Sequence, residues 1–153
     1  MKRLLSFTVL LLCSVVTAFA QLNGIETDAQ GVKYEQKGQV CYVWAFDKNS
    51  TVTNITIPET FKGLPVRGID SNAFNGSTNI TSVSIPNTVW SIGSHAFFNC
   101  SGLTNVQIPS SVEYINGFAF ANCTGFRSLT IPKNVRTIGE SAFAGCESLA
   151  SLT

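Results

Sequence analysis

The sequence predicts a solenoid, in which coils stack so that their strands form a parallel β-sheet on one face, with irregular or short helical return segments. Three observations predict this fold class. A unit of 23 residues repeats, each unit holds one short run of alternating polar and apolar residues, and that run ends in Ile-Pro. The remaining apolar positions of the unit fit neither a continuous helix nor an antiparallel meander.

The repeat is visible in three kinds of position that recur together. An Ile-Pro pair, an Ala-Phe pair and a cysteine each return at intervals of 23 residues. They stand at Ile85-Pro86, Ile108-Pro109 and Ile131-Pro132; at Ala96-Phe97, Ala119-Phe120 and Ala142-Phe143; and at Cys100, Cys123 and Cys146. An earlier copy begins at Ile57-Pro58, but its Ala73-Phe74 comes five residues late. We therefore expect a looped-out insertion between Glu59 and Pro65.

Each unit predicts one strand. In the run from Asn105 to Ile108 polar residues alternate with apolar ones, so one row of side chains points into the core and the other points outward. The proline that follows ends the strand, because proline has no N–H to donate to a neighbouring strand. A single coil cannot bury its own apolar face, so its stability depends on the coils that cover it.

The ends of the array differ from its middle. Residues 53–153 predict about four coils and a truncated fifth, which begins at Leu149. Residues 21–52 are not a repeat, and two strand-forming runs flank a turn at Lys37-Gly38, which predicts a β-hairpin. The first coil of a solenoid exposes its core unless a cap covers it, and we assign the hairpin this role. No cap follows at the other end, so we expect the natural array to continue.

Residues 1–20 predict a signal peptide. Two basic residues precede an uncharged apolar stretch from 4 to 16, and the Ala-Phe-Ala sequence that ends at Ala20 has the small-x-small pattern of a cleavage site. An N-terminal anchor helix is the alternative, but the stretch is shorter than the ~20 residues that a span requires. We expect cleavage after Ala20, a secreted or cell-surface location, and no membrane insertion of the mature chain.

Composition narrows the classes of function. Hydrophobic residues make up 44% of the chain and charged residues 12%, so the chain can bury a core while its surface relies on Ser, Thr and Asn for solubility. After residue 20, eight Lys and Arg stand against nine Asp and Glu, a net charge of −1. No basic run or stripe occurs, which argues against nucleic acid as a partner.

Three cysteines stack in neighbouring coils of the predicted solenoid: Cys100, Cys123 and Cys146. Equivalent side chains of stacked coils point the same way rather than toward one another, which favours buried free thiols over one disulfide. A metal site is favoured least, because a straight ladder lacks tetrahedral convergence. We expect no metal and no cofactor, and a structural role for Cys41 in the hairpin.

Catalytic residues have little support in the sequence. His95 is the one histidine, and we expect it at a surface turn. Ser94 is adjacent to it and Asp70 lies one coil away, but a triad requires three converging roles. The carboxylates show no repeated spacing, and the glycines are turn residues rather than a phosphate-binding loop. We expect no enzyme activity.

Outward strand positions provide the candidate binding surface. They form two polar columns: Asn54, Ser82, Asn105, Ser128 and Ser151; and Thr56, Ser84, Gln107, Thr130 and Thr153. This surface is either a solvated sheet face or a small-polar surface that hydrogen-bonds a protein or glycan. Trp90 and Tyr114, on neighbouring coils, either form an exposed aromatic pair of the kind found at interfaces or pack on the return path.

The unit from Leu103 to Cys123 resembles the BspA-type leucine-rich repeat. Its Leu-Thr-Asn-Val-Gln-Ile-Pro beginning and its Ala-Phe-x-x-Cys end match that family's pattern, and the match extends over about residues 53–153. The sequence departs from the pattern at four positions: Ser77, Trp90, Asn116 and Phe118. The resemblance implies a curved, right-handed leucine-rich-repeat solenoid of a secreted or surface protein.

The resemblance also implies a function. Adhesion and binding to host molecules are the recurrent roles in that family. We therefore expect an extracellular or cell-surface binding module, whose partner is a protein or glycan on a host or neighbouring cell. A passive structural spacer in a larger surface protein is the alternative.

Overall fold

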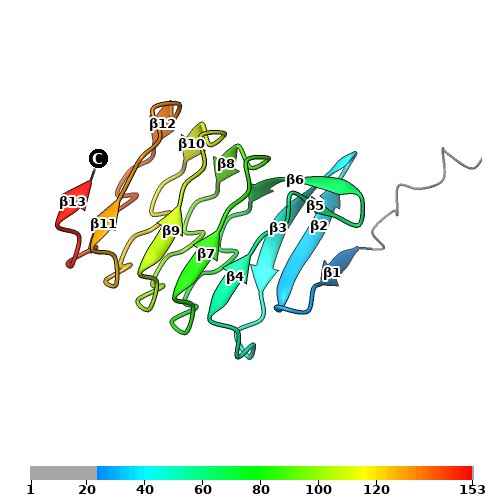
Figure 1. Cartoon of the computed structure of the whole chain (residues 1–153), viewed down its shortest axis with the longest axis horizontal. Helices are drawn as coiled ribbons and strands as arrows, with labels where there is room; N and C mark the ends of the chain where they lie inside the picture. Colours follow the sequence, from blue (N-terminus) through cyan, green and yellow to red (C-terminus); the bar gives the residue numbers. More distant parts are fainter. Residues whose placement is uncertain (1–23, 153) are drawn as a thin grey trace, which may run out of the picture.

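The structure is a computed structural model that describes residues 24–152. The predicted signal peptide lies outside these residues. The described chain consists of strands and turns stacked side by side along the long axis of the molecule (Figure 1). Within it there is no helix, and hence no helix long and apolar enough to cross a membrane.

The strands that lead into Ile-Pro pair in parallel, as predicted. β4 (Asn54–Thr56), β7 (Ser82–Ser84) and β9 (Asn105–Gln107) form one ladder, in which each residue pairs with its equivalent in the next coil. β11 (Ser128–Leu129) and β13 (Ser151–Leu152) pair in the same way but form a separate sheet. The parallel strand face is therefore confirmed, with an interruption between β9 and β11.

A second parallel ladder runs along the return path. β6 (Leu64–Ile69), β8 (Ser91–Ile92), β10 (Tyr114–Ile115) and β12 (Thr137–Ile138) pair in that order. The described return segments thus contain turns and short strands in place of the short helices that the sequence also allowed. Strands of two residues suffice here because the coil length places the same backbone groups beside each other in every turn of the solenoid.

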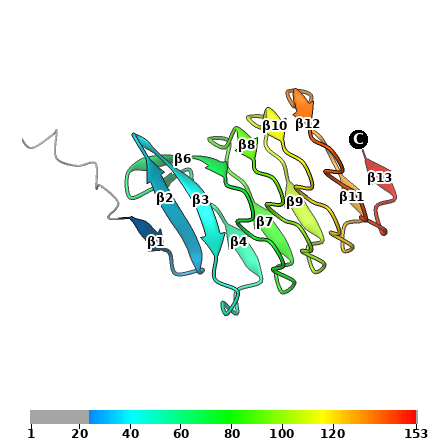
Figure 2. The same ribbon diagram turned by 180° about the vertical axis from the view of Figure 1, so that it is seen from behind.

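The N-terminal hairpin covers the first coil. β2 (Val32–Lys37) and β3 (Val40–Phe46) pair antiparallel, and β1 (Ile25–Thr27) adds a third antiparallel strand beside β2. β3 then pairs in parallel with β6, so the hairpin and the second ladder form one continuous sheet (Figure 2). This arrangement confirms the predicted hairpin cap.

The five-residue insertion expected between Glu59 and Pro65 forms a small hairpin. β5 (Thr60–Phe61) pairs antiparallel with the first residues of β6. Lys62 and Gly63 connect them with φ angles of 49° and 80°, the left-handed conformation that a two-residue hairpin turn requires. The ring of Phe61 stacks on that of Tyr34 with 4.1 Å between centroids, so the insertion packs against the cap.

A column of phenylalanine rings runs through the core. Phe74, Phe97 and Phe120 are fully buried and stack with ring centroids 5.0 and 5.1 Å apart. Phe143 continues the stack 5.5 Å beyond Phe120, and Phe46 of the cap lies 5.6 Å from Phe74 at a tilt of 34°. The Ala-Phe repeat thus contributes one ring per coil to a shared core.

Coverage of the core decreases in the last described coil. Ile115 is fully buried, whereas Ile138, its equivalent one coil later, is 50% exposed. Phe143 and Leu149 are likewise half-buried. Full burial of a coil's core residues therefore requires a neighbouring coil on both sides, as expected of a solenoid.

Candidate functional site

The strand face brings six of the predicted site residues into two registered columns. Partners across β4, β7 and β9 are Asn54, Ser82 and Asn105 in one column, and Thr56, Ser84 and Gln107 in the other. The central residue of each strand is buried: Ile55, Val83 and Val106. Because side chains alternate along a strand, this burial fixes both polar columns on the outer face.

Three further predicted residues lie beyond the interruption in the ladder, and Thr153 lies outside the described residues. Ser128 belongs to β11 and pairs with Ser151, and Thr130 follows β11. All three side chains are exposed. The columns therefore continue past the interruption, but over a separate sheet.

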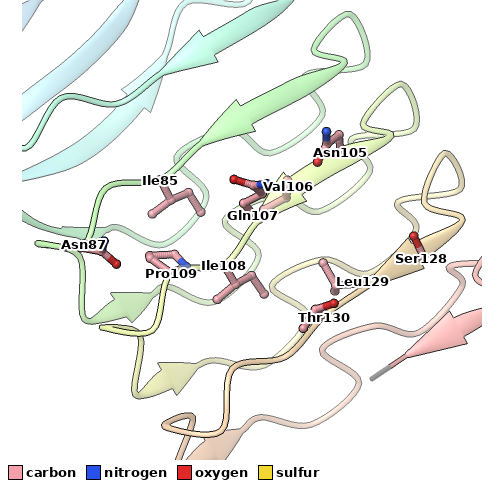
Figure 3. A pocket seen from close by; sticks show the side chains of 10 residues that line it. All are labelled: Ile85, Asn87, Asn105, Val106, Gln107, Ile108, Pro109, Ser128, Leu129 and Thr130. Atoms are coloured by element: carbon pink, nitrogen blue, oxygen red, sulfur yellow. The ribbon is translucent and has the colours of Figure 1, made fainter.

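The strand face is hollowed in two places. The larger hollow, of about 490 Å³, lies where β9 and β11 diverge, and Figure 3 shows Asn105, Gln107, Ser128 and Thr130 around it. The smaller, of about 250 Å³, lies over β4, β7 and β9. Asn105 and Gln107 line both hollows, so the two adjoin.

The hollows have polar rims and apolar floors. Ile85, Ile108 and Leu129 contribute apolar surface to the larger hollow, and no charged residue lines either one. Sequence reasoning missed these floor residues and Asn87, which also lines the larger hollow. The sequence could have indicated Asn87, because this residue directly follows Ile85-Pro86. It stands just after a strand whose polar residues were already assigned to the site.

Trp90 and Tyr114 lie elsewhere, beside the second ladder. Tyr114 belongs to β10 and pairs with Ser91, and Trp90 directly precedes β8. The two rings form an edge-to-face pair with 5.5 Å between centroids and an interplanar angle of 88°. Trp90 is 44% exposed and Tyr114 is half-buried. The structure therefore does not bring this pair together with the polar columns, and neither aromatic residue lines a strand-face hollow.

The stacked cysteines are free thiols that join neighbouring coils. The thiols of Cys100 and Cys123 donate hydrogen bonds of 3.1 Å to the carbonyl oxygens of Phe74 and Phe97, respectively. Cys146 repeats this contact to Phe120 at 3.2 Å. Burial raises the pKa of the Cys100 thiol to about 12, so at neutral pH it remains a protonated donor.

His95 lies on a turn that faces the next coil. Its ring stacks on Phe118 with 5.0 Å between centroids and meets Phe98 edge-on at 5.2 Å. Asp70 is instead bound to Lys37, with 2.6 Å between Oδ2 and Nζ. Among residues 24–152, no group of three His, Cys, Asp or Glu side chains is arranged to hold a metal ion.

The repeat pattern identifies the family. The family pattern described as "BspA type Leucine rich repeat region (6 copies)" matches residues 67–153 of the chain. This chain belongs to the BspA-type leucine-rich repeat family. The matched residues include the end of β6, the rest of the second ladder and four of the five strands of the strand face, whereas the hairpin cap lies outside them.

Solved structures of bacterial leucine-rich repeat proteins share the fold of this chain. One from Bacteroides capillosus is 29% identical with a TM-score of 0.73, over 82% of this chain and 95% of that chain. One from Bacteroides ovatus is 29% identical with a TM-score of 0.67, over 84% of this chain and 41% of that chain.

A leucine rich cell surface protein from Faecalibacterium prausnitzii is also similar. It is 26% identical with a TM-score of 0.60, over 84% of this chain and 42% of that chain. The chain thus spans less than half the length of this protein and of the Bacteroides ovatus protein, but nearly all of the Bacteroides capillosus protein. No curated protein matches the chain.

Proposed function

We propose that this chain is a binding module of a secreted or surface-displayed protein, and that its strand face recognises a protein or glycan ligand. The observation that carries the proposal is the pair of adjoining hollows that share Asn105 and Gln107. Repeated polar side chains about 4.8 Å apart give an extended ligand the same hydrogen-bonding partners in successive coils.

The chemistry of the hollows supports binding. Ligand sites commonly combine an apolar surface with a few polar groups that fix orientation, and the larger hollow has both. Side chains on this face are already ordered by one another, since Asn54 Oδ1 accepts hydrogen bonds from Ser82 Oγ at 2.6 Å and from Thr81 Oγ1 at 3.0 Å. Ordered side chains lose less conformational entropy when a ligand binds.

Two observations support display outside the cell. Residues 1–20 have the basic start, apolar stretch and small-residue end of a signal peptide. The related Faecalibacterium prausnitzii protein is described as a cell surface protein. A surface location would place the uncharged strand face where it can meet a host or neighbouring cell.

The test is adhesion of beads coated with the whole chain to cultured host cells and to immobilised matrix proteins and glycans. The double variant Asn105→Ala/Gln107→Ala removes polar groups that both hollows share, and Ser84→Tyr fills the smaller hollow. We expect each to reduce adhesion by about tenfold, the scale of one or two lost buried hydrogen bonds. Ser101→Ala, at an exposed turn away from the hollows, should adhere like the parent chain. Unchanged adhesion of folded Asn105 and Gln107 variants would remove the strand face from the binding site.

A structural spacer is the second candidate. The chain spans less than half of two of its relatives, so coils of this type occur within longer proteins. A spacer predicts that the chain binds no cell, matrix protein or glycan in the same assay. It also predicts that removing whole coils from a displayed protein changes only how far its other domains stand from the surface.

A further inference from the structure

We infer that Trp90, Tyr114 and an adjoining charged hollow form a second site, which binds an oligosaccharide carrying one carboxylate per sugar. The hollow has a volume of about 530 Å³. Its lining residues are Ser110, Ser111, Glu113, Lys133, Asn134 and Arg136. None of them lines the strand-face hollows, so this inference goes beyond the proposed function and does not depend on it.

The backbone places the aromatic pair directly beside the hollow. The N–H groups of Glu113 and Tyr114 both donate to the carbonyl oxygen of Trp90, at 2.9 and 3.3 Å. The carbonyl oxygen of Glu113 in turn accepts from the N–H of Arg136 at 2.8 Å. Trp90, Glu113 and Arg136 are therefore lateral neighbours on three successive coils. Two coil spacings of about 4.8 Å separate Trp90 from Arg136, which is more than one sugar unit can span.

The charges of the hollow are complementary to one carboxylate, that of the sugar unit that occupies the hollow. Lys133 and Arg136 contribute two positive charges and Glu113 one negative charge, a net of +1. Arg136 contacts Glu113 through Nε at 3.3 Å, and its side chain is 70% exposed, so its terminal nitrogens remain accessible to a carboxylate of the ligand. Within residues 24–152, Lys133 forms no ion pair. A densely sulfated chain would exceed this small positive charge.

The neutral groups favour a sugar over an acidic peptide. The C–H groups of a sugar ring carry slight positive charge and stack on the negative face of an aromatic ring, and Trp90 is 44% exposed beside Tyr114. The amide of Asn134 donates to the carbonyl oxygen of Ser110 at 2.8 Å, which holds its Oδ1 in a fixed orientation to accept a hydroxyl hydrogen. Ser111 is fixed in the same manner, by a 2.6 Å hydrogen bond to the carbonyl oxygen of Val89.

The experiment uses tryptophan fluorescence of the whole chain. The sequence has two tryptophans, so Trp44→Phe leaves Trp90 as the one indole reporter. Titration with oligogalacturonate should give a saturable change in its emission. Fully methyl-esterified oligogalacturonate, which keeps the sugars but removes the charge, should bind at least about tenfold more weakly.

Variants with intact circular dichroism spectra then locate the site by calorimetry. Trp90→Ala should weaken oligogalacturonate binding by about tenfold, and Lys133→Gln by about fivefold at low salt. Arg127→Gln removes a positive charge from the same coil but outside the hollow, and should change affinity by less than about twofold. The strand-face variant Gln107→Ala should bind oligogalacturonate like the parent chain.

Several results would overturn the inference. These are no saturable binding of oligogalacturonate, equal binding of the methyl ester, or equal binding by Trp90→Ala. Tighter binding of a heparin hexasaccharide would assign the hollow to sulfated chains instead, and equal binding of poly-glutamate would assign it to acidic peptides. Each of these leaves the strand-face proposal intact, because that proposal is tested with variants of Asn105, Gln107 and Ser84.

Discussion

The side-chain amide of Gln30 pairs with both backbone groups of Thr56. Its Nε2 donates to the Thr56 carbonyl oxygen at 2.9 Å, and its Oε1 accepts from the Thr56 N–H at 2.8 Å. Asp28 and Ser50 hold Gln30 in place through hydrogen bonds of 2.8 Å to its N–H and 2.7 Å to its carbonyl oxygen. The Gln30 side chain thus makes the hydrogen bonds that a neighbouring strand would make at the outer edge of β4. An edge strand whose backbone groups stay unpaired can pair with another chain, and Gln30 prevents this at Thr56.

Replacement of Gln30 should therefore weaken the first coil. We expect Gln30→Ala to lower the free energy of unfolding by about 1–2 kcal/mol, because two backbone groups lose their partner. Gln30→Glu should cost more at neutral pH, since a carboxylate would face the Thr56 carbonyl oxygen with no hydrogen to donate. Urea unfolding measures both, with the exposed Gln39→Ala as the control. If Gln30→Ala unfolds at the same urea concentration as Gln39→Ala, the amide contributes nothing to the edge.

The phenylalanine stack predicts a gradient of stability along the solenoid. Phe97 lies between two rings and is fully buried, so Phe97→Ala should cost about 3–5 kcal/mol. Phe143 is half-buried in the last described coil, so Phe143→Ala should cost less than half as much. Denaturant unfolding of the two variants tests this. Equal losses would show that coverage by both neighbouring coils does not determine the contribution of each ring.

The strand face, the hairpin cap and the thiol column could be predicted from the sequence because each follows a strong local pattern. Ile-Pro fixes where a strand ends, and the interval of 23 residues fixes which residues become neighbours. The pairing of Ser82 with Asn105 is a direct consequence of that interval.

The second ladder could not be predicted in the same way. Its strands have two residues, as in Tyr114–Ile115, and such a pair carries no periodicity. The second ladder determines how the chain turns after each proline. Tyr114 lies on this ladder and Trp90 directly precedes one of its strands, and for this reason they are separated from the polar columns of the strand face. Similarly, the hollow between β9 and β11 depends on an interruption of pairing that the sequence, which repeats evenly, does not indicate.

Ser77 departs from the cysteine column and is left without a partner. It occupies the position of Cys100 one coil earlier and is 2% exposed, and within the described residues its Oγ has no hydrogen-bond partner. An unpaired buried hydroxyl carries a desolvation penalty of about 1–3 kcal/mol. We therefore expect Ser77→Ala to raise the free energy of unfolding by about 1 kcal/mol.

A serine placed at one of the cysteine positions provides the matched test. In Cys123→Ser the shorter C–O bond moves the donor away from the Phe97 carbonyl oxygen, so we expect a loss of about 1–3 kcal/mol. Thermal unfolding of both variants under reducing conditions measures the pair. A loss of stability in Ser77→Ala would mean that the hydroxyl has a stabilising contact after all.

The buried thiols predict how stability depends on alkaline pH. Burial raises the pKa of Cys100 from an ordinary value of 9.0 to about 12, and it raises the pKa of Cys123 as well, with a smaller contribution from the neighbouring thiols. Because the folded pKa lies above the unfolded one, the unfolded chain loses its protons first as pH rises. The contribution of these thiols is thus fully present below about pH 8.5 and is lost progressively toward pH 12, by about 1 kcal/mol per thiol at pH 10.

Urea unfolding at pH 7, 8.5 and 10 in a reducing buffer measures this dependence. The variant Cys100→Ala/Cys123→Ala should be less stable at pH 7 but should lose less stability between pH 8.5 and 10, because it lacks the two groups whose ionisation favours unfolding. Tyrosine and lysine titrate in both proteins and cancel in the comparison. If the two proteins lose equal stability over this interval, the thiols already ionise within the fold. The thiol hydrogen bonds that join each coil to the phenylalanine carbonyl oxygen of the coil before it would then be lost as the pH rises through the ordinary thiol pKa of 9.0.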